Sequence, residues 1–286
     1  MARPVTSIDQ YAVLGDPISH SRSPQIHALF AAQTGQRLEY RAILVEPGQF
    51  AAAADAFRAA GGKGLNVTVP FKQDAWVYAD ILSARAERAG AVNTLLFRDS
   101  GEALGENTDG PGLIRDLKVN HGVELAGRRI LLLGAGGAAR GVLPPLLAEQ
   151  PVRLIIANRT PAKAVELALL FSDLGQASAC GFPELAGQRF DLIINATAAG
   201  LSGEIPPLPQ GVLAEGSWCY DMMYGDSPTP FLRWAHEQGA AAAVDGLGML
   251  VEQAAESFLL WRGVRPETRP VIARLRAAGA SLAADP

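Results

Sequence analysis

Three polar stretches carry side chains that an ordinary core strand or helix does not need. They are SHSRSP at residues 19–24, NVTVPFK at residues 66–72, and the pair NT at residues 93–94 and NTDG at residues 107–110. Ligands of α/β proteins gather beyond the carboxyl ends of strands, and here hydroxyls, amides, one ammonium and one carboxylate follow apolar runs. This set of groups suits a small polyhydroxylated acid.

The second stretch places its polar side chains in a strand and at the start of a helix. Asn66, Thr68 and Pro70 fall on one face of the strand because side chains alternate. Lys72 stands where the positive end of the helix dipole disfavours a cation, which indicates a use beyond stability. Taken singly, serines also cap helices, asparagines also form turns, and a lysine is often only a solvated charge.

A glycine-rich turn lies near the middle of the chain. The letters LGAGGAAR at residues 133–140 follow an apolar run and open a helix-prone stretch. In a dinucleotide-binding turn Gly134 would allow the tight reversal and Gly136 would let the backbone approach a pyrophosphate, which the helix start attracts. Many such turns only join a strand to a helix, but the context favours a redox enzyme.

The next apolar run, residues 153–157, indicates which dinucleotide is bound. It ends about 20 residues after the glycines, where this fold meets the adenosine ribose. An NAD enzyme usually has a carboxylate there, whereas a guanidinium can hold a 2′-phosphate through two charge-assisted hydrogen bonds. The threonine and the proline after it also read as a helix N-cap and first turn, and both roles are compatible. We predict NADP, because the chain offers Asn158, Arg159, Thr160 and Lys163.

Short apolar runs alternate with helix-like stretches along the chain, which is typical of an α/β fold. With 286 residues the chain exceeds the usual size of a single core, so two domains are expected. The runs that predict strands cover residues 11–14, 40–45, 64–69, 130–133, 153–157, 191–194 and 218–220, with a hairpin at 93–98 and 102–105.

The mid-chain position of the glycine turn sets the predicted domain boundary. Residues 1–108 form an N-terminal α/β domain, and residues 109–247 form a Rossmann-type domain with a parallel sheet. The C-terminal helices, within residues 248–286, can pack on either domain, and we assign them to the first.

Composition excludes several classes of protein. The chain is 49% hydrophobic and 19% charged with a net charge of −4 and no basic cluster, so nucleic acid is not an expected partner. No apolar run approaches a membrane span, and the polar residues 1–10 do not resemble a signal peptide, so we expect a cytoplasmic protein. Cys180 and Cys219 have no metal-binding spacing and are expected to be buried free thiols, and no metal site is predicted.

Taken together and in order, these motifs resemble those of the shikimate dehydrogenase family over nearly the whole chain. The serine stretch follows GDPI, the asparagine stretch follows GL, and further motifs complete the match. The matching motifs lie at residues 15–24, 64–72, 90–94, 105–110, 133–140, 158–160, 195–197, 220–222 and 245–250.

The resemblance implies reversible hydride transfer between NADPH and C3 of 3-dehydroshikimate, which gives shikimate on the route to chorismate and the aromatic amino acids. Lys72 and Asp109 match the family's catalytic pair. An ammonium near the C3 oxygen can donate a hydrogen bond and stabilise developing alkoxide charge, with Asp109 orienting it. Which of the two carries the transferred proton stays open, because burial and a neighbouring carboxylate shift a lysine pKa in opposite directions.

The same resemblance assigns binding residues. Ser21 and Ser23 bind the substrate carboxylate, and Tyr224 completes the pocket near that end. The ring hydroxyls are held by Asn66, Thr68, Asn93, Asp109 and Gln253, with Lys72 at the reacting oxygen. The cofactor is contacted by Gly134, Ala135, Gly136, Gly137, Ala138, Asn158, Arg159, Thr160, Lys163, Met222, Gly246 and Met249. Glu106 departs from the family's usual aspartate, and Lys163 stands where an arginine is common.

Three alternatives compete with this interpretation. A quinate/shikimate dehydrogenase that uses NAD would show an acidic residue after residue 157, and the serine pair also disfavours it. A non-catalytic NADP-binding regulator on the same fold would be expected to lose Lys72 or Asp109. A folate-linked dehydrogenase of similar architecture leaves the serine pair unexplained. The expected partner is the small substrate alone, bound by a monomer or a homodimer.

Overall fold

The computed structural model describes residues 8–197 and 199–282. Its contacts divide the chain into unit 1, Met1–Thr108 with Gln253–Val271, and unit 2, Asp109–Glu252 with Ile272–Pro286. The chain therefore passes between the units three times. The sequence predicts residues 248–286 as part of the first domain, whereas most of helix α10 (Arg269–Leu282) belongs to unit 2. Arg276 of this helix donates to Asp245 there, with Nη1 and Oδ2 2.7 Å apart.

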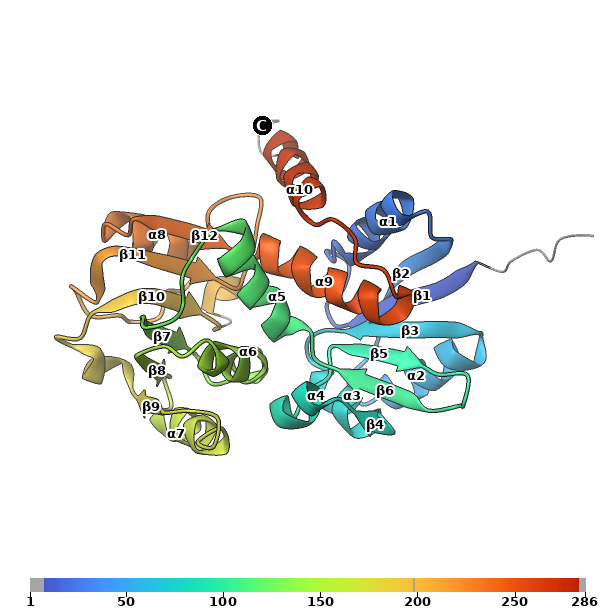
Figure 1. Ribbon diagram of the computed structural model, residues 1–286, viewed down its shortest axis with the longest axis horizontal. Coiled ribbons are helices and arrows are strands. Elements are labelled where there is room, and N and C mark those ends of the chain that lie inside the picture. Colours follow the sequence, from blue (N-terminus) through green and yellow to red (C-terminus); the bar gives the residue numbers. More distant parts are fainter. Residues whose placement is uncertain (1–7, 198, 283–286) are drawn as a thin grey trace, which may run out of the picture. The chain divides into compact units, whose positions relative to one another are not determined.

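Unit 2 is built on a parallel sheet, as predicted. Its described strands lie in the order β12-β11-β10-β7-β8-β9, which is the Rossmann arrangement with its switch point between β7 and β10 (Figure 1). Ligands of such sheets bind beyond the strand ends at that point. The strands are β7 (Arg129–Leu133), β8 (Arg153–Ala157), β9 (Ala177–Cys180), β10 (Phe190–Asn195), β11 (Leu213–Asp221) and β12 (Ala242–Asp245).

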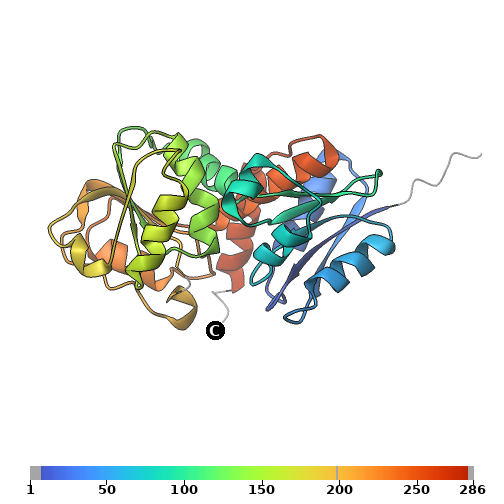
Figure 2. The same cartoon turned by 90° about the horizontal axis from the view of Figure 1, so that it is seen from below.

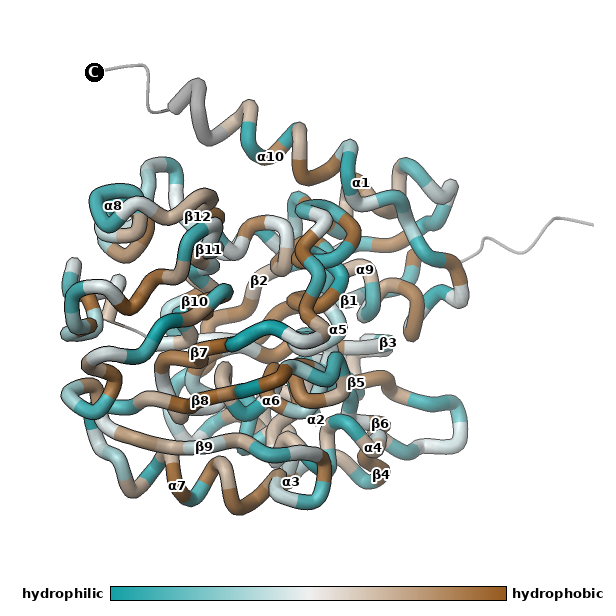
Figure 3. Tube along the Cα trace, turned by 60° about the vertical axis from the view of Figure 1, so that its left-hand side comes forward, coloured by the Kyte–Doolittle hydropathy of each residue, from teal (hydrophilic) through white to brown (hydrophobic). Residues whose placement is uncertain are grey.

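Helices cover both faces of this sheet. Leu132 and Ile156 belong to a core with α5 (Asp109–Arg115), α6 (Gly137–Ala148) and α7 (Pro161–Leu170). Their neighbours Leu131 and Ile155 belong to a second core with α8 (Pro230–Glu237). Because alternate side chains enter opposite cores, the central strands are apolar along their length, as the brown colour of β8 shows (Figure 3).

Unit 1 has a mixed sheet in the order β2-β1-β3-β5-β6-β4. β1 runs parallel to β2 and β3, whereas β5 runs antiparallel to β3 and β6. The start of β5 therefore lies beside the end of β3, with Thr94 opposite Asn66, and the end of β6 returns to the same place. The strands are β1 (Asp9–Gly15), β2 (Leu38–Leu44), β3 (Gly62–Val67), β4 (Ile81–Leu82), β5 (Thr94–Phe97) and β6 (Ala103–Glu106).

Two helical layers enclose the sheet of unit 1. One core joins the strands to α2 (Phe50–Ala59), α3 (Lys72–Tyr78) and α4 (Ala84–Ala89). The other face carries α1 (Ser23–Thr34) and the second half of α9 (Leu247–Arg262), whose Trp261 stacks on Tyr11 with ring centroids 4.6 Å apart. Figure 2 shows α2 (blue) and the end of α9 (red) on opposite sides of the strands.

Cys180 and Cys219 are both buried and free, as predicted, and burial raises the pKa of Cys219 to about 12. Among the described residues no group of histidine, cysteine and acidic side chains could hold a metal ion. No helix within that part of the chain has the length and apolar character that crossing a membrane requires.

His27 is a buried imidazole without charge. It is 0% exposed and stacks on Tyr40 with ring centroids 4.2 Å apart and planes 5° from parallel. Neither ring nitrogen has a hydrogen-bond partner among the described residues. Burial, opposed by the nearby Asn66 amide, lowers the pKa of His27 to about 3, so the ring is neutral in the folded protein near pH 7.

This buried ring predicts a pH dependence of stability. Between the unfolded value of 6.5 and the folded value of about 3, the unfolded chain binds a proton that the folded chain excludes. Stability from this source is therefore complete above pH 6.5 and is lost as the pH falls through that range. We expect the free energy of unfolding to fall by about 1 kcal/mol per pH unit more in wild type than in His27→Phe. Urea unfolding at several pH values measures it, and equal pH dependence in both proteins would contradict the assignment.

Candidate active site

The ends of β1 and β3 meet at one edge of the unit 1 sheet. The Thr68 N–H donates to the Leu14 carbonyl at 3.0 Å, and the Asp16 N–H donates to the Val69 carbonyl at 3.0 Å. Gly15 lies so close to Thr68 that a Cβ atom there would overlap the threonine methyl group. These contacts bring residues 16–23 and 68–72, two of the polar stretches, to the same edge.

The predicted serine pair lies at the start of α1. Ser23 is its first residue and is 7% exposed, and its N–H donates to the Ser21 Oγ at 3.3 Å. The Ser21 hydroxyl thus stabilises the turn as an acceptor, which leaves its proton able to donate. A capping role and a binding role are therefore compatible at Ser21.

Lys72 is the first residue of α3, where the sequence predicted it. Its side chain is half-buried, and its carbonyl accepts the Val92 N–H at 2.9 Å. This bond ties the helix start to the segment that leads into Asn93. The backbone thereby holds the ammonium-bearing residue and the asparagine at one edge of unit 1.

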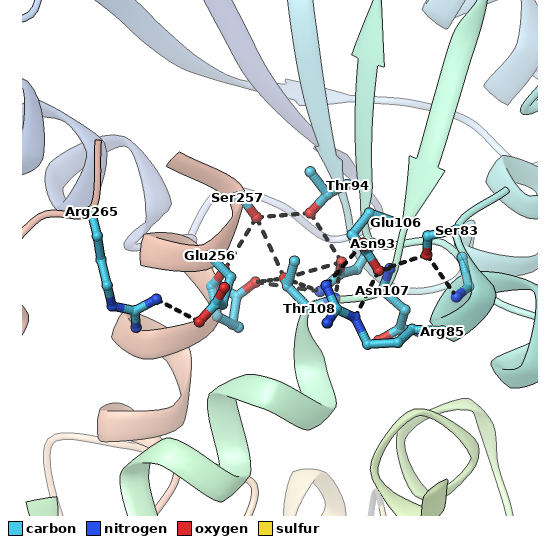
Figure 4. A network of polar contacts seen from close by, with 12 residues as sticks. Ser83, Arg85, Asn93, Thr94, Glu106, Asn107, Thr108, Glu256, Ser257 and Arg265 are labelled. Atoms are coloured by element: carbon cyan, nitrogen blue, oxygen red, sulfur yellow. Dashed lines mark hydrogen bonds and ion pairs between the residues drawn. The ribbon is translucent and has the colours of Figure 1, made fainter. Parts of the chain in front are cut away.

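Asn93 lies at the centre of a buried network (Figure 4). Its Oδ1 accepts the Thr108 N–H at 2.9 Å and the Thr94 hydroxyl at 3.0 Å. Its Nδ2 donates to the Thr108 Oγ1 at 3.0 Å and to the Gln253 Oε1 at 3.4 Å. The structure thus joins Asn93 and Gln253, two residues that are 160 positions apart in the sequence.

Glu106, which departs from the family's usual aspartate, supports the loop that leads to Asp109. Its carboxylate accepts from the Ser83 hydroxyl at 2.7 Å, from Arg85, and from the Asn107 N–H at 2.8 Å. Figure 4 shows these side chains converging on it. The carboxylate is therefore engaged by protein donors in the described chain.

The glycine turn of unit 2 has the geometry that the sequence predicted. Gly134 has a φ of +102°, which a side chain rarely adopts, and a Cβ there would lie 3.1 Å from the Ala196 carbonyl at the end of β10. A Cβ at Gly136 or Gly137 would meet no atom within 4 Å. The start of α6 is therefore open beside the switch point, with Ala135 and Ala138 half-buried on either side of the two glycines.

The polar residues after β8 stand at the neighbouring strand end. Asn158 is half-buried, and its Nδ2 donates to the Thr160 carbonyl at 2.9 Å. Thr160 is the N-cap of α7, but its side chain makes no capping hydrogen bond. Arg159 and Lys163 are exposed, so their charges are presented to solvent beside this helix start.

The predicted nicotinamide-side residues gather at the ends of β11 and β12. Gly246 donates its N–H to the Met223 carbonyl at 3.0 Å, and a Cβ there would overlap the Met222 backbone. Met249 is 7% exposed and belongs to the core of α5 and α6, so filling that core is at least part of its role. Tyr224 is half-buried in the segment after β11.

A buried carboxylate that the sequence did not indicate lies against the start of α9. Asp116 is 0% exposed and accepts from the Tyr220 hydroxyl at 2.6 Å and from Asn120 at 2.9 Å. Gly248 packs directly on it, with no room for a side chain. Asp116 begins a π-helical turn, η1 (Asp116–Asn120), which no local sequence pattern announces.

The two residues of the predicted catalytic pair belong to different units. Lys72 is in unit 1, and Asp109 is the first residue of unit 2 and of α5, with 6% exposure. Asp109 directly follows Thr108 of the Asn93 network. Thr94 and Thr108 of that network lie in polar stretches that the sequence indicated, although no individual role was predicted for them. Ser257 was missed, although it stands four residues after Gln253, on the same helix face.

Family models match three parts of the chain. The model of the shikimate dehydrogenase substrate binding domain matches residues 13–95, and the shikimate / quinate 5-dehydrogenase model matches residues 117–202. The model of the shikimate 5'-dehydrogenase C-terminal domain matches residues 246–276.

Individual proteins are similar over nearly the whole length. The protein from Alkalilimnicola ehrlichii named shikimate dehydrogenase (NADP(+)) is 63% identical over 94% of this chain and 98% of its own. Its namesake from Methylococcus capsulatus is 62% identical over 96% and 98%. Shikimate 5-dehydrogenase from Thermus thermophilus, solved in complex with NADP(H) and shikimate, is 34% identical with a TM-score of 0.84 over 94% and 99% of the two chains.

The two relatives named shikimate dehydrogenase (NADP(+)) exceed 60% identity over more than nine-tenths of both chains, and the Thermus thermophilus enzyme has a similar fold. The chain belongs to the shikimate dehydrogenase family.

Proposed function

We propose that this protein catalyses the reversible, NADP-dependent reduction of 3-dehydroshikimate to shikimate. The observation that carries the proposal is the combination of an open glycine turn at a Rossmann switch point with a separate edge of serine, lysine and asparagine side chains. The high identity to proteins named for this activity supports it. A cytoplasmic location and a monomeric or dimeric state stay predictions.

The residues of unit 2 fit NADP. The space above Gly136 and Gly137 lets a pyrophosphate approach the first N–H groups of α6, to which the helix dipole attracts an anion. Arg159 and Lys163 would hold the 2′-phosphate, with Asn158 and Thr160 beside it. Gly134, Ala135 and Ala138 would shape the pyrophosphate turn, and Met222, Gly246 and Met249 would line the nicotinamide side.

The chemistry requires a proton from the protein. When bound, NADPH supplies the hydride that C3 receives, and the C3 oxygen must then gain one proton to become a hydroxyl. We assign Lys72 as the residue that contacts this oxygen. Its ammonium donates a hydrogen bond to the oxygen and stabilises the negative charge that develops there. Asp109 is assigned as its partner in proton transfer.

The remaining groups would bind the substrate. Ser21 and Ser23 can donate hydroxyl hydrogen bonds to its carboxylate, with Tyr224 near that end. Thr68, Asn93, Asp109 and Gln253 would hold the ring hydroxyls. Asn66, at the end of β3, would share this task.

Lys72→Ala should lower kcat with little change in the KM for shikimate. A positioned acid or base contributes about 10² to 10⁴ in rate, and the loss should fall in that range. Steady-state oxidation of shikimate with NADP measures it. Lys63→Ala is the matched control, since Lys63 is half-exposed and forms a surface ion pair with Asp99 at 3.8 Å. A Lys72 variant that keeps more than about a tenth of wild-type kcat would remove Lys72 from the mechanism.

Ser21→Ala should raise the KM for shikimate and leave the KM for NADP unchanged. A hydrogen bond to a charged group contributes about 1.5 to 3 kcal/mol, so the rise should be tenfold or more. Ser100→Ala, in the turn between β5 and β6, is the control. A folded Ser21 variant with unchanged KM would mean that the hydroxyl only supports the start of α1.

Arg159→Ala should weaken NADP and leave NAD nearly unaffected, because NAD presents only a hydroxyl where NADP carries the phosphate. The preference should shrink by roughly 2 kcal/mol, the size of one charge-assisted contact. The ratio of kcat/KM for the two cofactors is measured in wild type, in this variant and in Arg153→Ala, an exposed arginine at the other end of β8. Equal loss for both cofactors, or a wild-type preference for NAD, would contradict the phosphate contact.

A further inference from the structure

A cluster of charged and hydroxyl groups lies against the start of α9, within unit 2. It joins Asp116 of η1, Tyr220 of β11, Asp245 at the end of β12 and Arg276 of α10. Asp116 and Tyr220 are 0% exposed, whereas the Arg276 side chain is half-exposed. We call these four side chains the α9 cluster.

Tyr220 connects Asp116 to the backbone of α9. Its hydroxyl donates to the Asp116 Oδ2 at 2.6 Å and accepts a hydrogen bond from the Met249 N–H. Burial raises the pKa of Tyr220 well above its usual value, and the nearby carboxylate adds to this effect, so the hydroxyl stays protonated near pH 7. One phenol oxygen therefore links the buried carboxylate to a residue of the proposed nicotinamide side.

Gly248 brings the same carboxylate into direct contact with the helix. A Cβ atom on Gly248 would overlap the Asp116 carboxylate, so the helix backbone lies against Asp116 with no side chain between them. The first turn of a helix carries the positive end of its dipole, which favours a carboxylate at this place. Asn120 holds the other carboxylate oxygen, with its Nδ2 2.9 Å from the Asp116 Oδ1. Asp116 is thus fixed by η1 and packed on the start of α9.

Arg276 holds the residue that leads into this helix. Its two terminal nitrogens donate to the two carboxylate oxygens of Asp245, with Nη1 and Oδ2 2.7 Å apart. The Asp245 Oδ1 also accepts the Leu247 N–H at 3.2 Å, which forms an Asx turn at the start of α9. The residue between them is Gly246, whose backbone lies against Met222. The guanidinium of α10 therefore acts on the proposed nicotinamide turn through one carboxylate.

We infer that the α9 cluster positions Gly246 and Met249 for the nicotinamide end of NADP. Tyr220 and Arg276 are positioning residues, because both hold the backbone of this turn and neither is assigned a contact with the cofactor. The inference rests on the proposed function. It predicts that the two side chains affect the nicotinamide half of NADP and leave the 2′-phosphate half, assigned to Arg159, unaffected.

The first test compares NADP with adenosine 2′,5′-bisphosphate, a fragment that lacks the nicotinamide. Tyr220→Phe and Arg276→Gln should each lower kcat/KM for NADP by about threefold to tenfold, the equivalent of one hydrogen bond. The inhibition constant of the fragment, which competes with NADP, should stay unchanged. Arg276→Lys keeps a charge and should recover part of the loss. A change of equal size for both ligands, or for neither, would overturn the inference.

Two matched controls remove the same chemical groups elsewhere. Tyr78→Phe deletes a hydroxyl that donates to Asp55 at 2.7 Å in unit 1. Arg274→Gln removes an exposed guanidinium two residues before Arg276 on α10. Both control proteins should keep the wild-type kcat/KM for NADP. A loss in Arg274→Gln as large as that in Arg276→Gln would mean that the charge of α10 acts without the Asp245 contact, and would overturn the positioning role of Arg276.

A double-mutant cycle tests whether Asp116 itself sets the position of the helix. Gly248→Ala adds a methyl group where the Asp116 carboxylate lies, so the start of α9 must shift, and kcat/KM for NADP should fall about tenfold. In an Asp116→Ala background the methyl group has room, and the same substitution should cost less than about threefold. Equal effects in both backgrounds would overturn the contribution of Asp116. If the Asp116 variant does not fold, the comparison of Tyr220→Phe with Tyr78→Phe decides the inference.

The two proposals fail in different ways. A wild-type protein that cannot oxidise shikimate with NADP overturns the proposed function and the positioning role with it. An active wild type in which NADP and the fragment respond alike to the substitutions at Tyr220 and Arg276 overturns only the positioning role. An active wild type in which NADP alone responds supports both.

Discussion

Parallel strands of one sheet bring all their carboxyl ends to a single edge, and the chemistry of this chain depends on that constraint. In unit 2 it places the glycine turn after β7 beside the end of β10 and beside the polar residues 158–160 after β8. In unit 1 the parallel strands β1 and β3 end at the same edge of the sheet. The antiparallel strand β5 begins at that edge, and β6 ends there. Since β5 begins where β3 ends, residues from four separate strand ends reach one place.

The parts of the fold that the sequence predicted are those with strong apolar runs. The run at residues 153–157 matches β8 in full, because a strand covered on both faces is apolar throughout. The missed strands are β4, β9 and β12, which are two to four residues long and two of them rich in alanine. Their pairing with a neighbour, and not their own propensity, makes them strands.

The site was predictable as a set of residue types but not as a set of contacts. Some polar side chains at the ends of strands and helices can be recognised in the sequence, because the stability of the strand or helix does not require them. Examples are Asn66, Asn93 and Lys72. Ser257 is not among them, since a serine within a helix is unremarkable until its partner 191 residues away is known. The same is true of Asp116, whose donor Tyr220 is 104 residues distant. Contacts of this kind depend on the tertiary fold and leave no periodic signal.

The discontinuity of unit 1 has a consequence for the order in which the molecule is made. Asn66 leaves the ribosome 191 residues before Ser257, an interval of about 10 to 40 s at the usual rate of synthesis. During that time Tyr11 of β1 and Phe30 of α1 lack their ring contacts with Trp261 and Phe258, and the Asn66 amide lacks one of its acceptors. The strands of unit 2 are all synthesised within this interval. The first residues of the proposed substrate site to be synthesised therefore gain their contacts with α9 only after the whole sheet of unit 2 has been synthesised. Unit 1 is thus begun before that sheet and completed after it.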